Sequence, residues 1–208
     1  MTEAVETADA NARHAEKMKK FKEAKDKLLA TKTDEKGLLI VHTGAGKGKT
    51  SAALGMVFRH IAYEYPVGVV QFIKSPDWDT GEAKLLRRFP ELVTLQVMGE
   101  GFTWNTQDRE RDIATARAAW EEAKQLIRDD RHRLVLLDEL NIVLRYDYLP
   151  VDEVVDFLRS EKPDWKHVVI TGRNAKPELI EIADLVTEMT LVKHPFKAGI
   201  KAQKGIEY

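Results

Sequence analysis

Cysteine is absent from the 208-residue sequence, which excludes disulfides, zinc-thiolate sites, iron-sulfur clusters and cysteine nucleophiles. The histidines show no HxxxH or HxH spacing, which argues against a protein-held catalytic metal of the zinc type. No stretch approaches the roughly 20 apolar residues of a membrane span. The polar residues 1–27 contain no apolar core of a secretory signal. We therefore expect a soluble protein of the reducing cytoplasm, without a membrane partner.

An excess of basic residues is also missing. The formal net charge of -1 argues against a general nucleic-acid binder, so any cationic site must be local. With 43% apolar residues, a chain of this length suffices for one packed domain and is too short for two.

A glycine-rich turn ending in lysine and threonine follows the apolar residues 38–41. It reads Thr43-Gly44-Ala45-Gly46-Lys47-Gly48-Lys49-Thr50. Glycines let backbone amides converge on phosphate oxygens, and a following helix start adds the positive end of its dipole. Lys49 is expected beside the outer phosphates, and the Thr50 hydroxyl in the shell of a magnesium ion. The loop departs from the Walker A consensus in one respect, since Thr43 stands at the position of the first glycine. The alternative to a phosphate-binding loop is an ordinary glycine-rich β-to-α turn with accidental lysines.

A second nucleotide-site element is the apolar run 134–137 followed by Asp138 and Glu139, which is the Walker B pattern. Adjacent side chains at a strand end point in different directions, so one carboxylate can order the water shell of magnesium while the other reaches the ion. Burying two carboxylates together is costly without a cation, which favours magnesium. The alternative is a helix-start cap after a core strand.

Strands and helices alternate from residue 37 onward. We expect strands at 38–42, 67–73, 92–98, 134–137, 167–171 and 185–190, with helices at 49–63, 107–130, 151–160 and 177–183. This alternation predicts an α/β, P-loop (RecA-like) three-layer fold, with a mostly parallel sheet covered by helices on both faces. Ligands of such sheets bind at the carboxyl ends of the strands, where the glycine-rich turn lies.

Residues 1–36 form a separate arm before the P-loop domain at 37–208. Residues 1–12 are small and acidic and predict a disordered lead. Residues 13–30 are helix-permissive, with a thin apolar stripe on an otherwise basic helix; the stripe consists of Met18, Phe21, Leu28 and Leu29. Two interpretations stay open, a solvated helix face or a mobile basic arm that closes over an anionic ligand in this or a neighbouring subunit.

These elements predict ATP and magnesium but leave the reaction open between hydrolysis, phosphoryl transfer to an acceptor and alkyl transfer with the triphosphate as leaving group. Further blocks along the chain narrow the choice. They are Gly99-Glu100-Gly101-Phe102-Thr103-Trp104-Asn105-Thr106-Gln107, Val70-Gln71-Phe72-Ile73-Lys74, Tyr146-Asp147-Tyr148-Leu149-Pro150, Ile170-Thr171-Gly172-Arg173 and Val192-Lys193-His194 through the end of the chain. With the two nucleotide elements, from about Gly37 to the last residue, the sequence resembles the CobA/CobO/BtuR family of ATP:corrinoid adenosyltransferases.

The resemblance implies that cobalt(I) of a reduced corrinoid attacks the 5' carbon of ATP and expels tripolyphosphate, in adenosylcobalamin biosynthesis or salvage. It implies a nucleotide that lies in the loop in reversed direction. The residues it assigns to ATP are Gly44, Ala45, Gly46, Lys47, Gly48, Lys49, Thr50, Ser51, Arg59 and Arg173. Those assigned to Mg²⁺ are Thr50, Asp138 and Glu139, and those assigned to catalysis are Lys49, Glu139, Phe102 and Trp104.

Phe102 and Trp104 match family aromatics that lie against one face of the corrin and exclude its lower axial ligand, which makes reduction to cobalt(I) accessible. Ordinary packing is the alternative for two aromatics in a loop. The sequence departs from the family at Ala45, often asparagine, and at Asn174, commonly glycine. The second departure leaves Arg173 open to another role, as a cation near Asp164 or Glu178.

The resemblance also implies a homodimer in which the N-terminal helix caps the partner's site, and a reduced flavoprotein as electron donor. Two alternative functions remain open. One is a P-loop ATPase that acts as a conformational switch on a protein partner, with Glu139 as the water-activating base. The other is a nucleotide-binding module without chemistry.

Overall fold

The computed structural model describes residues 2–75, 77, 80–99, 101 and 108–207, with residues 2–10 described by their backbone alone. The chain divides into two compact units, Met1–Glu35 and Lys36–Tyr208. In the described part of the chain, no helix is both long enough and apolar enough to cross a bilayer.

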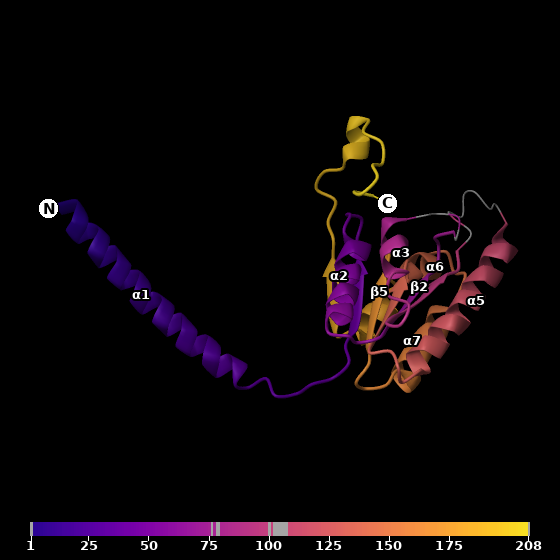
Figure 1. Cartoon of the computed structure of the whole chain (residues 1–208), viewed down its shortest axis with the longest axis horizontal. Coiled ribbons are helices and arrows are strands. Elements are labelled where there is room, and N and C mark those ends of the chain that lie inside the picture. The colour runs from indigo at the N-terminus through magenta and orange to yellow at the C-terminus, as the bar shows by residue number, and fades with distance from the viewer. Residues whose placement is uncertain (1, 76, 78–79, 100, 102–107, 208) are drawn as a thin grey trace. The chain divides into compact units, whose positions relative to one another are not determined.

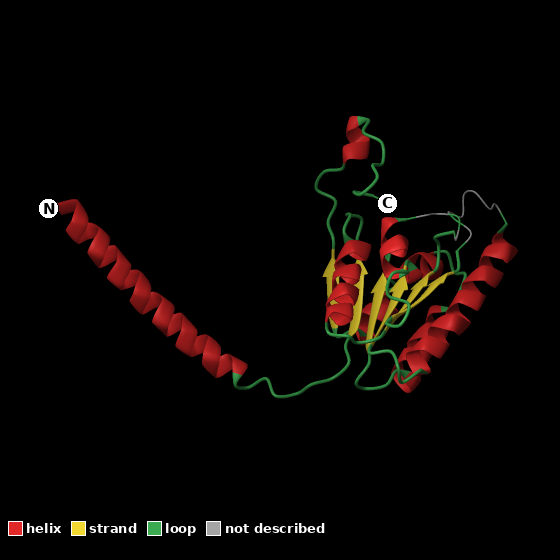
Figure 2. Ribbon diagram, in the orientation of Figure 1, coloured by secondary structure: helices red, strands yellow, loops and turns green. Residues whose placement is uncertain are grey.

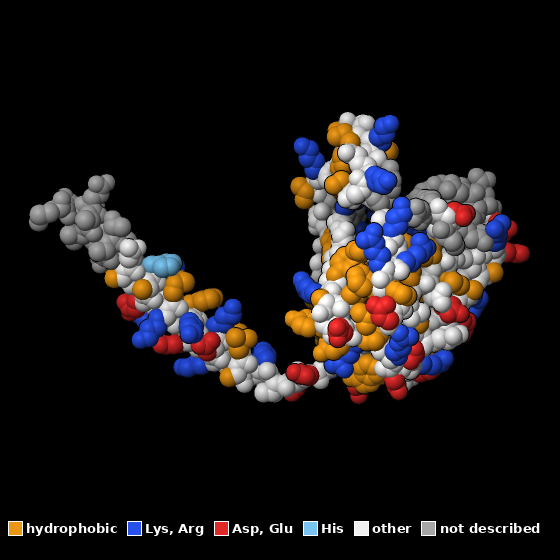
Figure 3. Space-filling model, in the orientation of Figure 1, with side chains coloured by type: hydrophobic (Ala, Val, Ile, Leu, Met, Phe, Trp, Pro, Cys, Tyr) orange, Lys and Arg blue, Asp and Glu red, His pale blue; other side chains and the backbone are white. Residues whose placement is uncertain are grey.

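The first unit consists of one long helix, α1 (Thr2–Leu29), and the start of a linker. The backbone is helical from Thr2, so the prediction of a disordered lead over residues 1–12 is wrong. Four of those twelve residues are alanine, the strongest helix former, and a small side chain does not by itself signal disorder. The apolar stripe is exposed, with Phe21 at 63% and Leu28 at 60%. Figure 3 shows cationic, acidic and apolar side chains interleaved along this helix.

The second unit is built on a parallel sheet (Figures 1 and 2). Its six described strands are β1 (Leu39–Thr43), β2 (Val67–Gln71), β3 (Val93–Val97), β4 (Leu134–Asp138), β5 (His167–Thr171) and β6 (Leu185–Glu188). They lie in the order β3-β2-β4-β5-β1-β6, and every pairing is parallel. The predicted strands are therefore confirmed, with β2 and β6 each ending two residues earlier than expected. The strand β5 lies between β1 and β4. The strand β1 leads into the glycine-rich turn 43–50, called the phosphate loop, and β4 ends at Asp138, which together with Glu139 is called the acidic pair.

Helices cover both faces of the sheet, because alternate residues of each buried strand point to opposite sides. In β4, Val135 and Leu137 belong to one hydrophobic cluster, and Leu134 and Leu136 to the other. The first cluster is completed by α5 (Arg109–Arg128), α6 (Leu140–Arg145), α7 (Val151–Glu161) and α8 (Pro177–Ile182). The second is completed by α2 (Lys49–Ala62) and α3 (Gly81–Leu86). The three-layer α/β fold is thus confirmed.

Two short helices, α3 and α6, were not expected from the sequence. Each has six residues, fewer than two turns, so neither displays a readable helical period. Beyond β6, a single 3₁₀ turn, η1 (Pro195–Ala198), interrupts an extended C-terminal segment.

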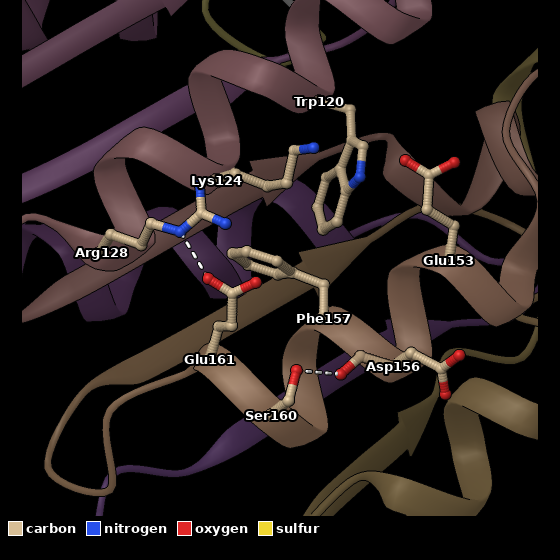
Figure 4. Close-up of a pocket in the computed structure, with 8 residues that line it drawn as sticks. All are labelled: Trp120, Lys124, Arg128, Glu153, Asp156, Phe157, Ser160 and Glu161. Atoms are coloured by element: carbon tan, nitrogen blue, oxygen red, sulfur yellow. Dashed lines mark hydrogen bonds and ion pairs between the residues drawn. The ribbon is translucent and has the colours of Figure 1, made fainter.

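The packing of α5 on α7 centres on Trp120 and Phe157, whose ring centroids lie 5.2 Å apart (Figure 4). Arg128 stacks over the ring of Phe157 and donates to Glu161 across the two helices. The shallow depression above these side chains contains none of the residues that the sequence assigned to a site.

The fully buried side chain of Lys166 packs against the C-terminal end of α5. Its ammonium donates to three backbone carbonyls at the end of this helix, those of Leu126 at 3.2 Å, Ile127 at 2.6 Å and Asp129 at 2.5 Å. The carbonyls of Leu126 and Ile127 belong to buried residues and have no partner within the helix, whereas Asp129 O also accepts from the N–H of His132. The lysine therefore satisfies two acceptors that burial would otherwise leave unpaired.

Candidate active site

The phosphate loop connects β1 to α2 at the carboxyl edge of the sheet. Gly44 has φ 96° and Gly48 has φ 109°, values that favour glycine because a Cβ atom would be strained there. Gly48 is the residue from which α2 starts, so the unpaired N–H groups of the first helical turn face the loop. The predicted strand, turn and helix are confirmed in their order.

The loop rests on the backbone that follows β6, a contact that the sequence did not reveal. A Cβ atom on Gly44 would lie 2.5 Å from the carbonyl oxygen of Met189, and one on Gly46 would lie 2.6 Å from that of Thr190. The N–H of Gly46 donates to Met189 O at 2.6 Å, and Met189 N–H donates to Thr43 O at 2.9 Å. Packing against the backbone after β6 therefore requires glycine at both positions, whatever the loop binds.

Lys49 is held inside this loop. Its side chain is buried, and its ammonium donates to the carbonyl oxygens of Gly44 at 2.9 Å and Gly46 at 2.5 Å. Burial lowers the pKa of Lys49, an effect that the negative charge of Glu139 opposes. The loop thus surrounds a fixed ammonium group with backbone dipoles.

Asp138 joins the loop to the acidic pair. Its Oδ1 accepts hydrogen bonds from the hydroxyls of Thr50 and Thr171, each at 2.8 Å. Its Oδ2 accepts from the Lys74 ammonium at 3.0 Å and from the Gln71 amide at 3.4 Å. The structure therefore brings Thr50 and Asp138 together, as the sequence predicted.

Lys74 corrects one step of the sequence argument. The burial of two carboxylates pointed to magnesium as the compensating cation, but Lys74 already supplies a positive charge to Asp138. The same ammonium also pairs with Glu82 of α3 at 2.7 Å. No local sequence pattern indicates this ion pair, because Lys74 and Asp138 lie 64 residues apart.

Glu139 starts α6 in a left-handed conformation, with φ 66°. Its backbone N–H donates to the Thr171 hydroxyl at 2.9 Å, and its carboxylate lies against Gly172, where a Cβ atom would be 3.1 Å from Oε2. Burial raises the pKa of Glu139 to about 7, with the charge of Asp138 adding to the effect and that of Lys49 opposing it. Near neutral pH this carboxyl is therefore close to half-protonated.

The geometry matches what comparison with known proteins finds. A model of the family described as ATP:corrinoid adenosyltransferase BtuR/CobO/CobP matches residues 35–208. The chain belongs to this family.

Similar proteins carry the same description. A corrinoid adenosyltransferase from Sinorhizobium is 62% identical over 199 residues, which cover 95% of this chain and 92% of the relative. One from Pseudomonas aeruginosa is 55% identical, covering 98% and 99%. Corrinoid adenosyltransferase CobA from Salmonella typhimurium is 44% identical, covering 96% and 100%. Among solved structures, a KaiC-like protein from Pyrococcus horikoshii superimposes with a TM-score of 0.47 at 15% identity, over 76% of this chain and 74% of that one.

Within this adenosyltransferase fold, Arg173 lies beside the loop. It lies close enough to Lys49 and Glu139 for its positive charge to act on both. Asn174, where glycine is common in the family, has φ 58°. Asparagine tolerates this left-handed region better than most residues, so the departure leaves the turn intact.

The other residues that were predicted to contact ATP do not all lie at the loop. Ala45 and Lys47 are exposed on the loop, Ser51 is exposed in the first turn of α2, and Lys47 forms an ion pair with Glu207 of the C-terminal segment. Arg59 lies in the last turn of α2, ten residues beyond Lys49 and about 15 Å along the helix axis. The structure therefore does not bring Arg59 to the loop of its own subunit.

Phe102 and Trp104 lie outside the described residues. The chain on either side of them is anchored, since Gly101 N–H donates to Ile73 O at 2.9 Å and the Asp108 side chain caps α5. Among the described residues, no group of three or more histidine, aspartate or glutamate side chains forms a metal cluster.

Proposed function

We propose that this chain transfers the 5'-deoxyadenosyl group of ATP to the cobalt(I) of a reduced corrinoid and releases tripolyphosphate, in the biosynthesis or salvage of adenosylcobalamin. One observation carries the proposal: a loop that encloses Lys49 meets the oxygen cluster of Thr50, Asp138 and Glu139 in a member of the adenosyltransferase family. In the reaction, the cobalt electron pair forms the bond to C5'. The C5'–O bond breaks, and its electrons remain on the oxygen of tripolyphosphate.

The role proposed for the loop is to stabilise this leaving group. Negative charge grows on the tripolyphosphate as the C5'–O bond breaks, and fixed cations and N–H dipoles stabilise it at that moment. Lys49 is the central cation, with Lys47 and Arg173 close enough to act on it electrostatically. Backbone groups from Gly44 through Gly48 and the hydroxyls of Thr50 and Ser51 complete the proposed phosphate contacts.

The residues present fit a magnesium ion. Thr50 and the two carboxylates are hard oxygen donors, the ligand class that Mg²⁺ prefers. Because Thr50 gives its hydroxyl hydrogen to Asp138, the lone pairs of its oxygen are free for a cation. We assign Thr50 and Glu139 to the ion and Asp138 to its water shell. When bound, Mg²⁺ neutralises charge on the triphosphate.

For Phe102 and Trp104 we keep the role that the family resemblance implies, covering one face of the corrin so that no lower axial ligand reaches cobalt. Loss of an axial donor lowers the energy of the orbital that accepts the electron, which eases reduction to cobalt(I). The cobalt arrives with the corrinoid substrate, so no histidine of the chain is assigned to it.

The proposal extends to a homodimer in which α1 of one subunit covers the active site of the other. The exposed apolar stripe and the lysines of α1 support this, since such a helix gains by burying Phe21 and placing cations near a triphosphate. The proposed electron donor is a reduced flavoprotein. The proposed location is the cytoplasm, where ATP and a reducing environment are both available.

The test supplies the protein with ATP, Mg²⁺ and cobalamin that has been chemically reduced to cobalt(I). We expect adenosylcobalamin, followed by its absorbance, and an equal amount of intact tripolyphosphate, followed by ³¹P NMR. Lys49→Ala should weaken or abolish both. Inorganic phosphate formed without adenosylcobalamin would reject the proposal and favour the ATPase switch instead.

A further inference from the structure

A chain of three charged side chains crosses the carboxyl edge of the sheet beside the phosphate loop. Glu82 of α3 pairs with Lys74 at 2.7 Å, and Lys74 pairs with Asp138 at 3.0 Å. Only 17% of the Lys74 side chain and 1% of the Asp138 side chain are exposed. Pairs as little exposed as these are weakly screened by solvent, so each member strongly affects the next.

The Asp138 carboxylate is held on both oxygens by these contacts. Two hydroxyls donate to Oδ1, and an ammonium and an amide donate to Oδ2. Rotation of the carboxylate would break the bonds on both oxygens at once, so the bond from Lys74 fixes the direction of Oδ1.

The orientation of Oδ1 determines both proposed cation ligands. Thr50 points its hydroxyl hydrogen at Asp138 and therefore its lone pairs away from it. Thr171 does the same and accepts the backbone N–H of Glu139, which is held in the left-handed conformation at the start of α6. A disturbance of Asp138 would reach Thr50 directly and Glu139 through Thr171.

We propose that Lys74 is a positioning residue of the cation site: it holds Asp138 in one orientation, so that Thr50 and Glu139 present their oxygens together, and Glu82 holds Lys74 in turn. This inference rests on the proposed function, since it concerns the Mg²⁺ that accompanies ATP. Lys74 itself touches neither ATP nor the cation in this scheme. It acts through Asp138 alone.

A simple charge-balancing role for Lys74 predicts the opposite sign. If Lys74 only offset the charge of Asp138, its removal would leave a more negative site, and Mg²⁺ would bind more tightly. If Lys74 positions Asp138, its removal frees a buried carboxylate to rotate away from Thr50 and Thr171, and Mg²⁺ binds less tightly.

The experiment measures how much Mg²⁺ tightens ATP binding, by calorimetry with ATP in MgCl₂ and in EDTA, without corrinoid. In Lys74→Met, we expect the tightening to fall by about tenfold or more, the range typical of groups that orient metal ligands. Glu82→Gln should cause a smaller loss of the same sign, and Lys74→Arg should restore part of it. The control is Lys166→Met, which removes another buried lysine, at the end of α5, and should leave the tightening unchanged.

Circular dichroism first establishes that each variant is folded, and Glu82→Gln, which keeps Lys74 in place, provides the reading if Lys74→Met does not fold. Unchanged or stronger tightening by Mg²⁺ in Lys74→Met, or in Glu82→Gln where only that variant folds, would overturn the proposal. Because the measurement needs no corrinoid, failure of adenosyl transfer by the parent protein would count against the proposed function and leave this result standing.

Discussion

Replacing Glu139 with glutamine is expected to remove a pH-dependent penalty on folding. The pKa of this buried carboxyl rises from 4.5 to about 7 on folding, so between these values the folded protein keeps a proton that the unfolded chain has released. Raising the pH through that interval therefore destabilises the fold, and well above pH 7 the penalty is constant because both states are ionised. Glutamine stays neutral throughout and avoids the penalty.

The size of the effect follows from the same interval. At 1.36 kcal/mol for each pH unit, the rise from 4.5 to about 7 amounts to about 3 kcal/mol in full. Part of this penalty is already present at pH 5, because the unfolded chain is mostly ionised there. The stability of Glu139→Gln relative to the parent should therefore increase by about 2–3 kcal/mol between pH 5 and pH 8.

The assay is urea unfolding followed by circular dichroism at pH 5, 6, 7 and 8, in EDTA and without nucleotide, at constant ionic strength. Subtracting the parent at each pH cancels the titration of other groups. Glu91→Gln, at an exposed turn, is the matched control, and its difference from the parent should stay near zero. A Glu139→Gln difference that is the same at every pH would refute the reasoning.

Three further variants test other parts of the site. Gly46→Ala places a Cβ atom 2.6 Å from the Thr190 carbonyl, so it should lower the free energy of unfolding by about 1–3 kcal/mol and weaken ATP binding about tenfold or more; an unchanged dissociation constant for ATP would contradict this. Lys166→Met leaves the carbonyls of Leu126 and Ile127 at the end of α5 without their donor and should cost about 2–4 kcal/mol in urea unfolding, whereas a loss below about 0.5 kcal/mol would show that water replaces the ammonium. Arg59→Ala, about 15 Å from Lys49 along α2, should change the dissociation constant for ATP by less than about twofold in calorimetry; a tenfold loss would return Arg59 to the phosphates.

The local parts of the site could be predicted from the sequence. An apolar run, a glycine-rich turn and a helical pattern are each contained in a few residues, so β1, the loop and α2 were placed correctly, as was β4 with its two carboxylates. These are features whose cause lies within one strand–turn–helix unit.

The contacts that complete the site could not be predicted, because parallel strands bring together residues that no local signal connects. Lys74 meets Asp138 because β2 and β4 are neighbours, and Met189 lies behind Gly44 because β6 pairs with β1. The burial of the acidic pair favoured magnesium in the sequence, and the positive charge that Lys74 adds beside Asp138 was missed for this reason. The residues around Asp138 and Glu139 contain no signal for a lysine that follows the neighbouring strand β2.

The position of β1 in the sheet has a consequence for the way the protein is made. This strand is synthesised before all the others, yet its two neighbours, β5 and β6, are the last described strands of the chain. Pairings between such distant segments form slowly, and until they form both edges of Leu39–Thr43 can pair with another molecule. We expect ribosome-bound chains that stop before His167 to aggregate and to be unable to bind ATP, because the loop proposed to hold its phosphates gains its support only after β5 and β6 have been translated.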